Sequence, residues 1–185
     1  CIQGELKGKV LEPFSSIHTT YAEFKELYPD GLLLKKPQKG PKGSPYEGYF
    51  ADPDKLGIFG RQDDFRKLDG KDLVFGLRLD GKQVAISRDY IAEKQYVLIE
   101  HDGAPILVYY DGTSNTVAAY NLNGDNELSA GVEFGNEKII LNDMAWDART
   151  GEALSANTAD LRHFPIFTAY WFAWFSFYPE TELKK

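Results

Sequence analysis

Three histidines (His18, His101 and His163) and one cysteine, Cys1, are the residues of the types that most often catalyse reactions or bind metals. The histidines do not occur in an H-x-x-x-H or similar spacing, and a single cysteine provides no cysteine-rich metal motif. His101 precedes an Asp-Gly dipeptide, which favours a turn position over a catalytic base. The sequence contains neither a G-x-S-x-G elbow nor a glycine-rich phosphate motif. These residues indicate no catalytic residue, metal or cofactor, and they favour a protein that is not an enzyme.

Four tyrosines near predicted turns are the remaining candidates for a binding site. Tyr46 and Tyr49 lie in "SPYEGYF", and Tyr109 and Tyr110 lie in "LVYYDG". An aromatic ring with a polar tip can bind sugar-like or extended ligands, although packing at the rim or in the core is the alternative. Acidic pairs such as Asp63-Asp64 do not indicate a glycosidase, which needs two facing carboxylates at a defined separation.

The charge balance argues against nucleic acid as a partner. The 185 residues include 21 basic and 28 acidic side chains, for a net charge of −7, whereas phosphate binding requires a basic surface. The most basic stretch, residues 32–43, is predicted to be a solvated loop, with an anion-binding loop as the alternative. Cys1 cannot form an internal disulfide. It is compatible with the lipid-bearing first residue of a bacterial lipoprotein, or with a longer chain that was cut at this point.

The elements that would position these residues include an aromatic helix near the C-terminus. Nine of the fifteen residues 164–178 are aromatic and none is charged. A membrane helix needs about 20 apolar residues, so this run is too short to span a bilayer. Because Phe172 and Phe175 make the face opposite Trp171 and Trp174 apolar as well, we predict a central core helix that is buried on both sides. The alternative is a helix whose second face is covered by a protein partner or by a missing segment.

The same pattern occurs earlier in the chain at a constant offset of 150 residues. Aromatic and apolar residues repeat at i, i+3 and i+7 in both copies, and a proline then follows each predicted helix. Thr20 and Glu23 form the capping-box pattern at the start of the first copy. The pairs that correspond are Leu11 with Leu161, Phe14 with Phe164, Tyr21 with Trp171, Phe24 with Trp174, Tyr28 with Tyr178, and Leu33 with Leu183. We therefore predict an internal duplication of a helix-containing unit.

The rest of the chain has the pattern of β-strands joined by tight turns. Strands are predicted at residues 73–79, 83–87, 96–101, 106–110 and 116–121, and "VEFGNEKIILND" adds a hairpin. The fold class is therefore mainly β (α+β), with antiparallel hairpins and a few short helices. For the domain organisation we predict that residues 1–36 are the tail of a first unit and residues 37–60 a connecting loop. Residues 61–185 form a second unit, which packs with the first as one domain.

Several of these segments together resemble the bacterial and archaeal family known as domain of unknown function 3179. "GELKGKVLEPFSSIHTTYAEFKELYPDGLLL" is similar to the family's G-x-L-x-G-x-x-L stretch and T-T-W-x-x-W segment, with Tyr21 and Phe24 in place of two tryptophans. "SPYEGYF" is similar to a P-Y-x-x-Y element, "LDGKDLVFGLRLDGKQVAI" to a repeated strand pair, and "WDARTGEAL" to a W-x-x-x-T-G-x-A ending. The last similarity adds Asp143, Trp146 and Asp147 to the candidate ligand-binding residues.

The chain departs from the family pattern at the Y-C-P-x-C-G element. The corresponding place in the second unit is "VYYDGTSNTVAAY", residues 108–120, which has no cysteine. The sequence also enters the family pattern midway, which predicts that the start of the first unit is missing. The resemblance implies an extracytoplasmic protein and brings no established activity.

Two functions remain open at this point. The first is a non-catalytic, extracytoplasmic module for binding or assembly, with the aromatic helix as a possible protein interface. The alternative is the distal half of a metal- or redox-linked protein whose Cys-x-x-Cys lies upstream of Cys1. The sequence leaves the oligomeric state open.

Overall fold

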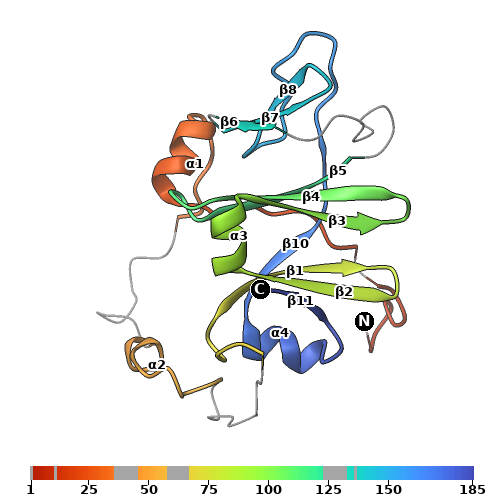
Figure 1. Cartoon of the computed structure of the whole chain (residues 1–185). Coiled ribbons are helices and arrows are strands. Elements are labelled where there is room, and N and C mark those ends of the chain that lie inside the picture. Colours follow the sequence, from red (N-terminus) through yellow and green to blue (C-terminus); the bar gives the residue numbers. More distant parts are fainter. Residues whose placement is uncertain (1, 11, 36–45, 58–66, 123–132, 136) are drawn as a thin grey trace.

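A computed structural model of the chain describes residues 2–10, 12–35, 46–57, 67–122, 133–135 and 137–185 (Figure 1). The described residues form four short helices: α1 (Tyr21–Leu27), α2 (Glu47–Ala51), α3 (Arg88–Lys94) and α4 (Trp171–Phe177). Their strands are β1 (Leu73–Leu79), β2 (Lys82–Ser87), β3 (Tyr96–His101), β4 (Ala104–Asp111), β5 (Thr116–Asn121), β6 (Glu133–Gly135), β7 (Lys138–Leu141), β8 (Met144–Asp147), β9 (Arg162–His163), β10 (Ile166–Tyr170) and β11 (Glu182–Lys184). The fold is therefore mainly β with antiparallel hairpins and short helices, as the sequence predicts.

The strands form three sheets. The first has the order β10-β1-β2-β11, the second β3-β4-β5-β9, and the third β6-β7-β8. Neighbouring strands are antiparallel except for β11, which pairs with β2 in parallel. Two of the hairpin turns need backbone with positive φ at both central positions: Asp102-Gly103 joins β3 to β4, and Asn142-Asp143 joins β7 to β8.

The molecule is layered, and apolar side chains make contacts on both faces of the two larger sheets. One set of side chains, including Phe75, Leu77, Ile99 and Val108, is buried between the first and second sheets. The opposite face of β4 and β5 packs against the β6-β7-β8 sheet and buries Trp146 among other residues. Successive strand residues point to opposite faces, so each of these layers is formed by every second residue.

The outer face of the first sheet is covered by α4. Trp171 and Trp174 are buried there against Val74 and Ala85, while Phe177 on the outer side of the helix is 80% exposed. Phe172 and Phe175 are half-buried. The helix therefore has one buried face and one partly exposed face, in contrast to a helix buried on all sides.

The predicted connecting loop, residues 37–60, lies partly outside the described residues, since only residues 46–57 of it are described. That part contains α2. Cys1 and the lysines of residues 36–43 lie outside the described residues. The structure therefore does not test the predictions of a lipidated cysteine and of an anion-binding loop.

Candidate functional site

The four candidate tyrosines do not form one surface. Tyr109 and Tyr110 are neighbours on β4 and therefore point to opposite faces of the sheet, where both are buried. Tyr110 lies between the two larger sheets, with its ring centroid 5.4 Å from that of Phe75 and its hydroxyl donating to Asn115 Oδ1 at 2.9 Å. Tyr109 lies on the other face, beneath β7 and β8.

Tyr46 and Tyr49 lie at α2, far from β4 in Figure 1. The ammonium of Lys71 stands 4.1 Å from the ring centroid of Tyr49 and donates to the Tyr49 carbonyl oxygen, which fixes the helix to the loop before β1. These contacts are internal to the domain. The described residues thus separate the two tyrosine pairs into different parts of the molecule.

The segment "WDARTG", residues 146–151, brings two of the predicted residues together with Tyr109. Trp146 is fully buried, and its indole Nε1–H donates to the Ala159 carbonyl oxygen at 2.9 Å. Asp147 Oδ1 accepts the backbone N–H groups of Arg149 at 2.8 Å and Thr150 at 3.3 Å, which closes a tight turn. By contrast, Asp143 lies in the exposed β7–β8 turn.

Gly151 completes this turn for a steric reason. It has φ of +75°, and a Cβ built there would lie 2.6 Å from Cε1 of Tyr120. The Tyr120 hydroxyl donates to the Ala148 carbonyl oxygen at 2.9 Å, and His163 Nε2 lies 2.9 Å from the Thr150 carbonyl oxygen. Several hydrogen bonds therefore hold the loop against the core, and its residues have a structural role.

Arg149 projects from this loop into a group of carboxylates that we call the Arg149 cluster: Arg149, Asp147, Glu23, Glu137 and Glu26. Arg149 is only 9% exposed. Its guanidinium nitrogens lie 3.0 Å from Asp147 Oδ2, 2.9 Å from Glu23 Oε1, 3.1 Å from Glu137 Oε2 and 3.6 Å from Glu26 Oε1. Because Glu23 and Glu26 belong to α1, the cluster attaches the N-terminal part of the chain to the β-sheet domain.

Glu23 occupies a position that the sequence assigns to a capping box. The first half of that motif is present, since Thr20 Oγ1 accepts the Glu23 backbone N–H at 3.3 Å. The Glu23 carboxylate, however, binds Arg149, which lies 126 positions later in the chain. The local sequence pattern therefore predicted the Thr20 cap of α1 but not the ion pair between Glu23 and Arg149.

The electrostatic environment keeps Asp147 and Arg149 charged and the Tyr109 hydroxyl neutral at neutral pH. Partial burial disfavours the Asp147 carboxylate, but hydrogen bonds from the Arg149 side chain and backbone outweigh it and lower the pKa of Asp147. The hydrogen bonds that the Arg149 guanidinium donates to the Asp147 carboxylate are the main cause that raises the pKa of Arg149. Burial, followed by the charges of Asp111 and Glu137, raises the pKa of Tyr109 to about 12. None of these groups is suited to exchange protons near pH 7.

A second contact between the N-terminal part and the domain is a chain of hydroxyl groups. The Thr116 hydroxyl donates to Thr19 Oγ1 at 2.7 Å and lies 2.6 Å from Ser114 Oγ. The Ser114 hydroxyl donates to Asp111 Oδ2. Burial opposes ionisation of Asp111, but the hydrogen bonds from Ser114 and Thr113 lower its pKa. A depression of about 210 Å³ beside these residues is lined by His18, Thr19, Thr20, Ser114 and Asn115.

This second contact does not have the geometry of a catalytic serine. A nucleophilic serine needs a histidine base on its hydroxyl, with a carboxylate behind the histidine. Here Ser114 donates directly to Asp111, and His18 is an exposed residue at the rim of the depression. Asp111 and Ser114 occupy the place where the family resemblance leads one to look for the cysteine element, and they form a hydrogen-bonded turn.

A comparison with protein families identifies the family of the chain. The model of the family described as "Protein of unknown function (DUF3179)" matches residues 1–181. The chain belongs to this family. No curated protein and no solved structure matches it.

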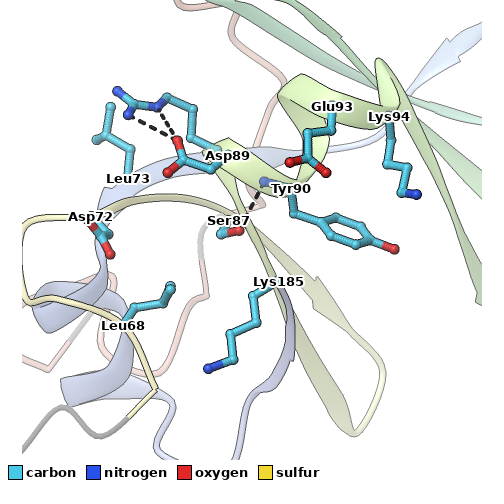
Figure 2. A pocket seen from close by; sticks show the side chains of 10 residues that line it. Leu68, Asp72, Leu73, Ser87, Asp89, Tyr90, Glu93, Lys94 and Lys185 are labelled. Atoms are coloured by element: carbon cyan, nitrogen blue, oxygen red, sulfur yellow. Dashed lines mark hydrogen bonds and ion pairs between the residues drawn. The ribbon is translucent and has the colours of Figure 1, made fainter.

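A cavity of about 590 Å³ in the described part of this DUF3179 chain lies where β2 meets α3 (Figure 2). Its lining carries three cations and three carboxylates, and the cations already have internal contacts. Arg88 binds Asp89 at 3.1 Å, the Lys94 ammonium lies 5.9 Å from the Tyr90 ring centroid, and Lys185 donates to the Lys67 carbonyl oxygen. Such a balanced lining provides no preference for an anion or a cation.

The described residues of the DUF3179 chain contain no group of three or more histidine, cysteine or carboxylate side chains that could hold a metal ion. None of their helices has the length and hydrophobicity needed to cross a bilayer. The residues that sequence analysis missed are Arg149, Glu23 as an ion-pair partner, and the hydroxyls of Thr19, Ser114 and Thr116. Their signal is weak, because the pairs Glu23–Arg149 and Thr19–Thr116 join residues that are 126 and 97 positions apart.

Proposed function

We propose that this chain is an extracytoplasmic module for protein binding or assembly, and that its N-terminal segment is the binding surface. By N-terminal segment we mean residues 2–10 and 12–35. The observation that carries the proposal is the concentration of exposed large apolar side chains in this segment: Ile2, Leu6, Val10, Phe14, Tyr21, Tyr28, Leu32, Leu33 and Leu34. The remaining described residues expose only Tyr46, Phe50, Leu98, Leu154 and Phe177 in this way.

The degree of exposure separates this segment from an ordinary surface. Phe14 is 86% exposed, Leu32 95% and Leu34 96%. Single exposed apolar residues are normal in soluble proteins, but their accumulation in one stretch marks interaction surfaces. In α4, by contrast, the tryptophans of the aromatic stripe are covered by β1 and β2. The proposal therefore assigns the partner to the N-terminal segment in preference to α4.

The contacts to the domain suit a segment that presents a surface. The hydroxyl chain at Thr19 and the Arg149 cluster at Glu23 attach the middle of the segment to the domain. The residues on either side, including Phe14 and Leu32, remain exposed. Because the middle of the segment is already attached to the domain, less conformational entropy is lost when a partner binds. The exposed residues on either side provide apolar surface that the partner can bury.

Photo-crosslinking in cells tests the proposal. A photoreactive amino acid replaces Phe14 or Leu32 in separate variants, and Leu154, which is exposed on the domain, serves as the matched control. We expect positions 14 and 32 to give an adduct with the same protein, and position 154 to give none. Equal adducts at all three positions, or none at 14 and 32, would contradict the proposal. Protease accessibility in cells with a permeabilised outer layer tests the extracytoplasmic location in the same samples.

A further inference from the structure

The outer edge of β3 is the longest sheet edge in the described part of the chain. The second sheet begins with β3, and no described strand pairs with its outer side. β3 has six residues, whereas the other edge strands, β6, β8, β9, β10 and β11, have two to five. A sheet edge of this length presents a row of backbone donors and acceptors to another strand.

This edge lacks most of the features that normally protect an edge strand, which are a proline, a bulge or a short length. The pairing of β3 with β4 runs without interruption from Tyr96 to His101, and the strand contains no proline. Its exposed side chains are those of Leu98, which is 37% exposed, and Glu100. The edge is therefore regular and partly apolar, with one carboxylate.

The direction of the backbone groups follows from the hydrogen bonds to β4. Tyr110 N–H donates to the Gln95 carbonyl oxygen, and the antiparallel register then directs the backbone groups of residues 95, 97, 99 and 101 toward β4. The backbone groups of Leu98 and Glu100, which lie between these residues, point to the outer edge. A strand that adds to this edge must therefore align its own donors and acceptors with Leu98 and Glu100.

A second copy of β3 satisfies this condition in the antiparallel orientation. With a two-fold axis perpendicular to the sheet, residues that face each other lie on the same side of the sheet, so even-numbered residues pair with even-numbered ones. A register centred on Leu98 overlaps the two strands over their whole length. It places Leu98 against Leu98 of the second copy, and Glu100 opposite Tyr96.

The charges at the two ends of β3 are opposite in sign. Lys94 precedes the strand, Glu100 and Asp102 lie at its other end, and all three are exposed. In the antiparallel arrangement the lysine end of each copy meets the carboxylate end of the other. Opposite charges on neighbouring strands stabilise the pair, whereas a parallel copy would place the carboxylates side by side. Charge complementarity therefore favours a second copy in the antiparallel orientation.

We propose that the outer edge of β3 is a homodimer interface, at which two copies of the second sheet join into one continuous antiparallel sheet. The interface is centred on Leu98. It contains no residue of the N-terminal segment, so this inference goes beyond the proposed function and does not depend on it.

Sedimentation velocity from micromolar to submillimolar protein concentration tests the dimer. We expect the mass of the wild-type protein to rise from that of one chain toward that of two. Leu98→Lys should weaken the dimer by about tenfold or more, because it replaces an apolar contact by two like charges directly opposite each other. Leu154→Lys, which changes an exposed leucine elsewhere on the domain, is the matched control and should associate like the wild type.

Disulfide crosslinking tests the register without adding a charge. Cysteines are introduced singly as Leu98→Cys or Glu100→Cys in a chain whose only other cysteine is removed by Cys1→Ser. In the proposed register the Cα atoms of the two residues 98 are about 5.5 Å apart, within the range that a disulfide bridges. The two residues 100 are about 13 Å apart along the strands, which is too far. With diamide as the oxidant, Leu98→Cys should form covalent dimers and Glu100→Cys should not.

Three results would overturn the proposal: a wild-type protein that stays monomeric over the whole concentration range, equal association of Leu98→Lys and Leu154→Lys, or crosslinking at position 100 as efficient as at position 98. Thermal unfolding of Leu98→Lys shows whether that variant is folded. If it is not, the mass of the wild type and the two cysteine variants still decide the question.

Discussion

Arg149 provides one of the two contacts that attach the N-terminal segment to the β domain, the other being the hydroxyl contact at Thr19. Its guanidinium contacts the carboxylates of Asp147 at the end of β8, of Glu23 in α1 and of Glu137. Asp147 orients the guanidinium by bonding Nε and a terminal nitrogen, which leaves the other terminal nitrogen for Glu23. A planar group with several fixed donors can join three segments in this way, whereas a lysine cannot.

Arg149→Ala is expected to destabilise the protein by about 3 kcal/mol, because it leaves partly buried carboxylates without their counter-ion. The matched control is Arg88→Ala, which removes an exposed pair with Asp89 and should cost less than about 1 kcal/mol. Urea unfolding at neutral pH measures both. Equal effects of the two substitutions would show that the Arg149 cluster does not act as a buried network.

The charge of Asp147 should contribute to the pH dependence of stability. Its folded pKa lies below the ordinary value of 3.8, so the unfolded chain takes up the proton more readily than the folded chain. The stabilisation is therefore complete above the ordinary pKa and is lost as the pH falls through the lowered folded value. Asp147→Asn keeps an oxygen acceptor for the turn but removes the charge.

We expect the urea midpoint of the wild-type protein to fall more steeply between pH 5 and pH 2 than that of Asp147→Asn, in the range set by the pKa values of carboxyl groups. Asp143→Asn, at an exposed turn position, is the control and should leave the slope unchanged. A slope in Asp147→Asn as steep as that of the wild type would contradict the assignment.

At the scale of elements, α1 and α4 should respond differently to the loss of an aromatic ring. Trp174→Ala is expected to cost about 3–5 kcal/mol, since the ring is buried on β1 and truncation leaves a cavity. Phe24→Ala, the substitution 150 positions earlier, should cost about 1 kcal/mol, because α1 has no buried residue. Thermal or urea unfolding of the pair measures the difference, and similar losses would mean that α1 is part of the core.

The elements themselves were largely predictable because their turns are local. Asp-Gly dipeptides end β1 and β3, and alternation of apolar residues then defines the strands on either side. The bounds of α1 and α4 follow from the aromatic stripe and the terminating proline, whereas the sequence pattern located neither α2 nor α3. Sheet order was not predictable, because pairing β10 with β1 and β11 with β2 depends on contacts between residues about 90 to 100 positions apart.

The candidate site was predictable only in part, for the same reason. The family resemblance of the segment "WDARTGEAL" pointed to Trp146 and Asp147, and the structure places them beside Tyr109. Tyr46, Tyr49 and Tyr110 have the same chemistry as Tyr109 but lie elsewhere, since composition near a turn does not determine the face to which a side chain points. Arg149 gave no signal because its partners Glu23 and Glu137 come from other segments.

At the scale of the whole molecule, the chain combines a layered β domain with a segment that is attached at few points. The domain buries apolar side chains between its sheets and beneath α4. Within the described residues, α1 buries none. Stability should therefore differ between the two parts, because local opening depends on the apolar contacts that are lost.

Hydrogen exchange in low concentrations of urea should resolve this difference. Amides of α1 that depend on the Arg149 cluster are expected to exchange by a local opening with little dependence on urea, because little surface becomes exposed. Amides of β1 and β2 should exchange only through global unfolding, with a steep dependence on urea. Arg149→Ala should accelerate α1 exchange at urea concentrations where β1 and β2 stay protected. If α1 instead exchanged in parallel with β1 and β2, the segment would be part of the cooperative domain, and a surface held ready for a partner would have to be sought elsewhere.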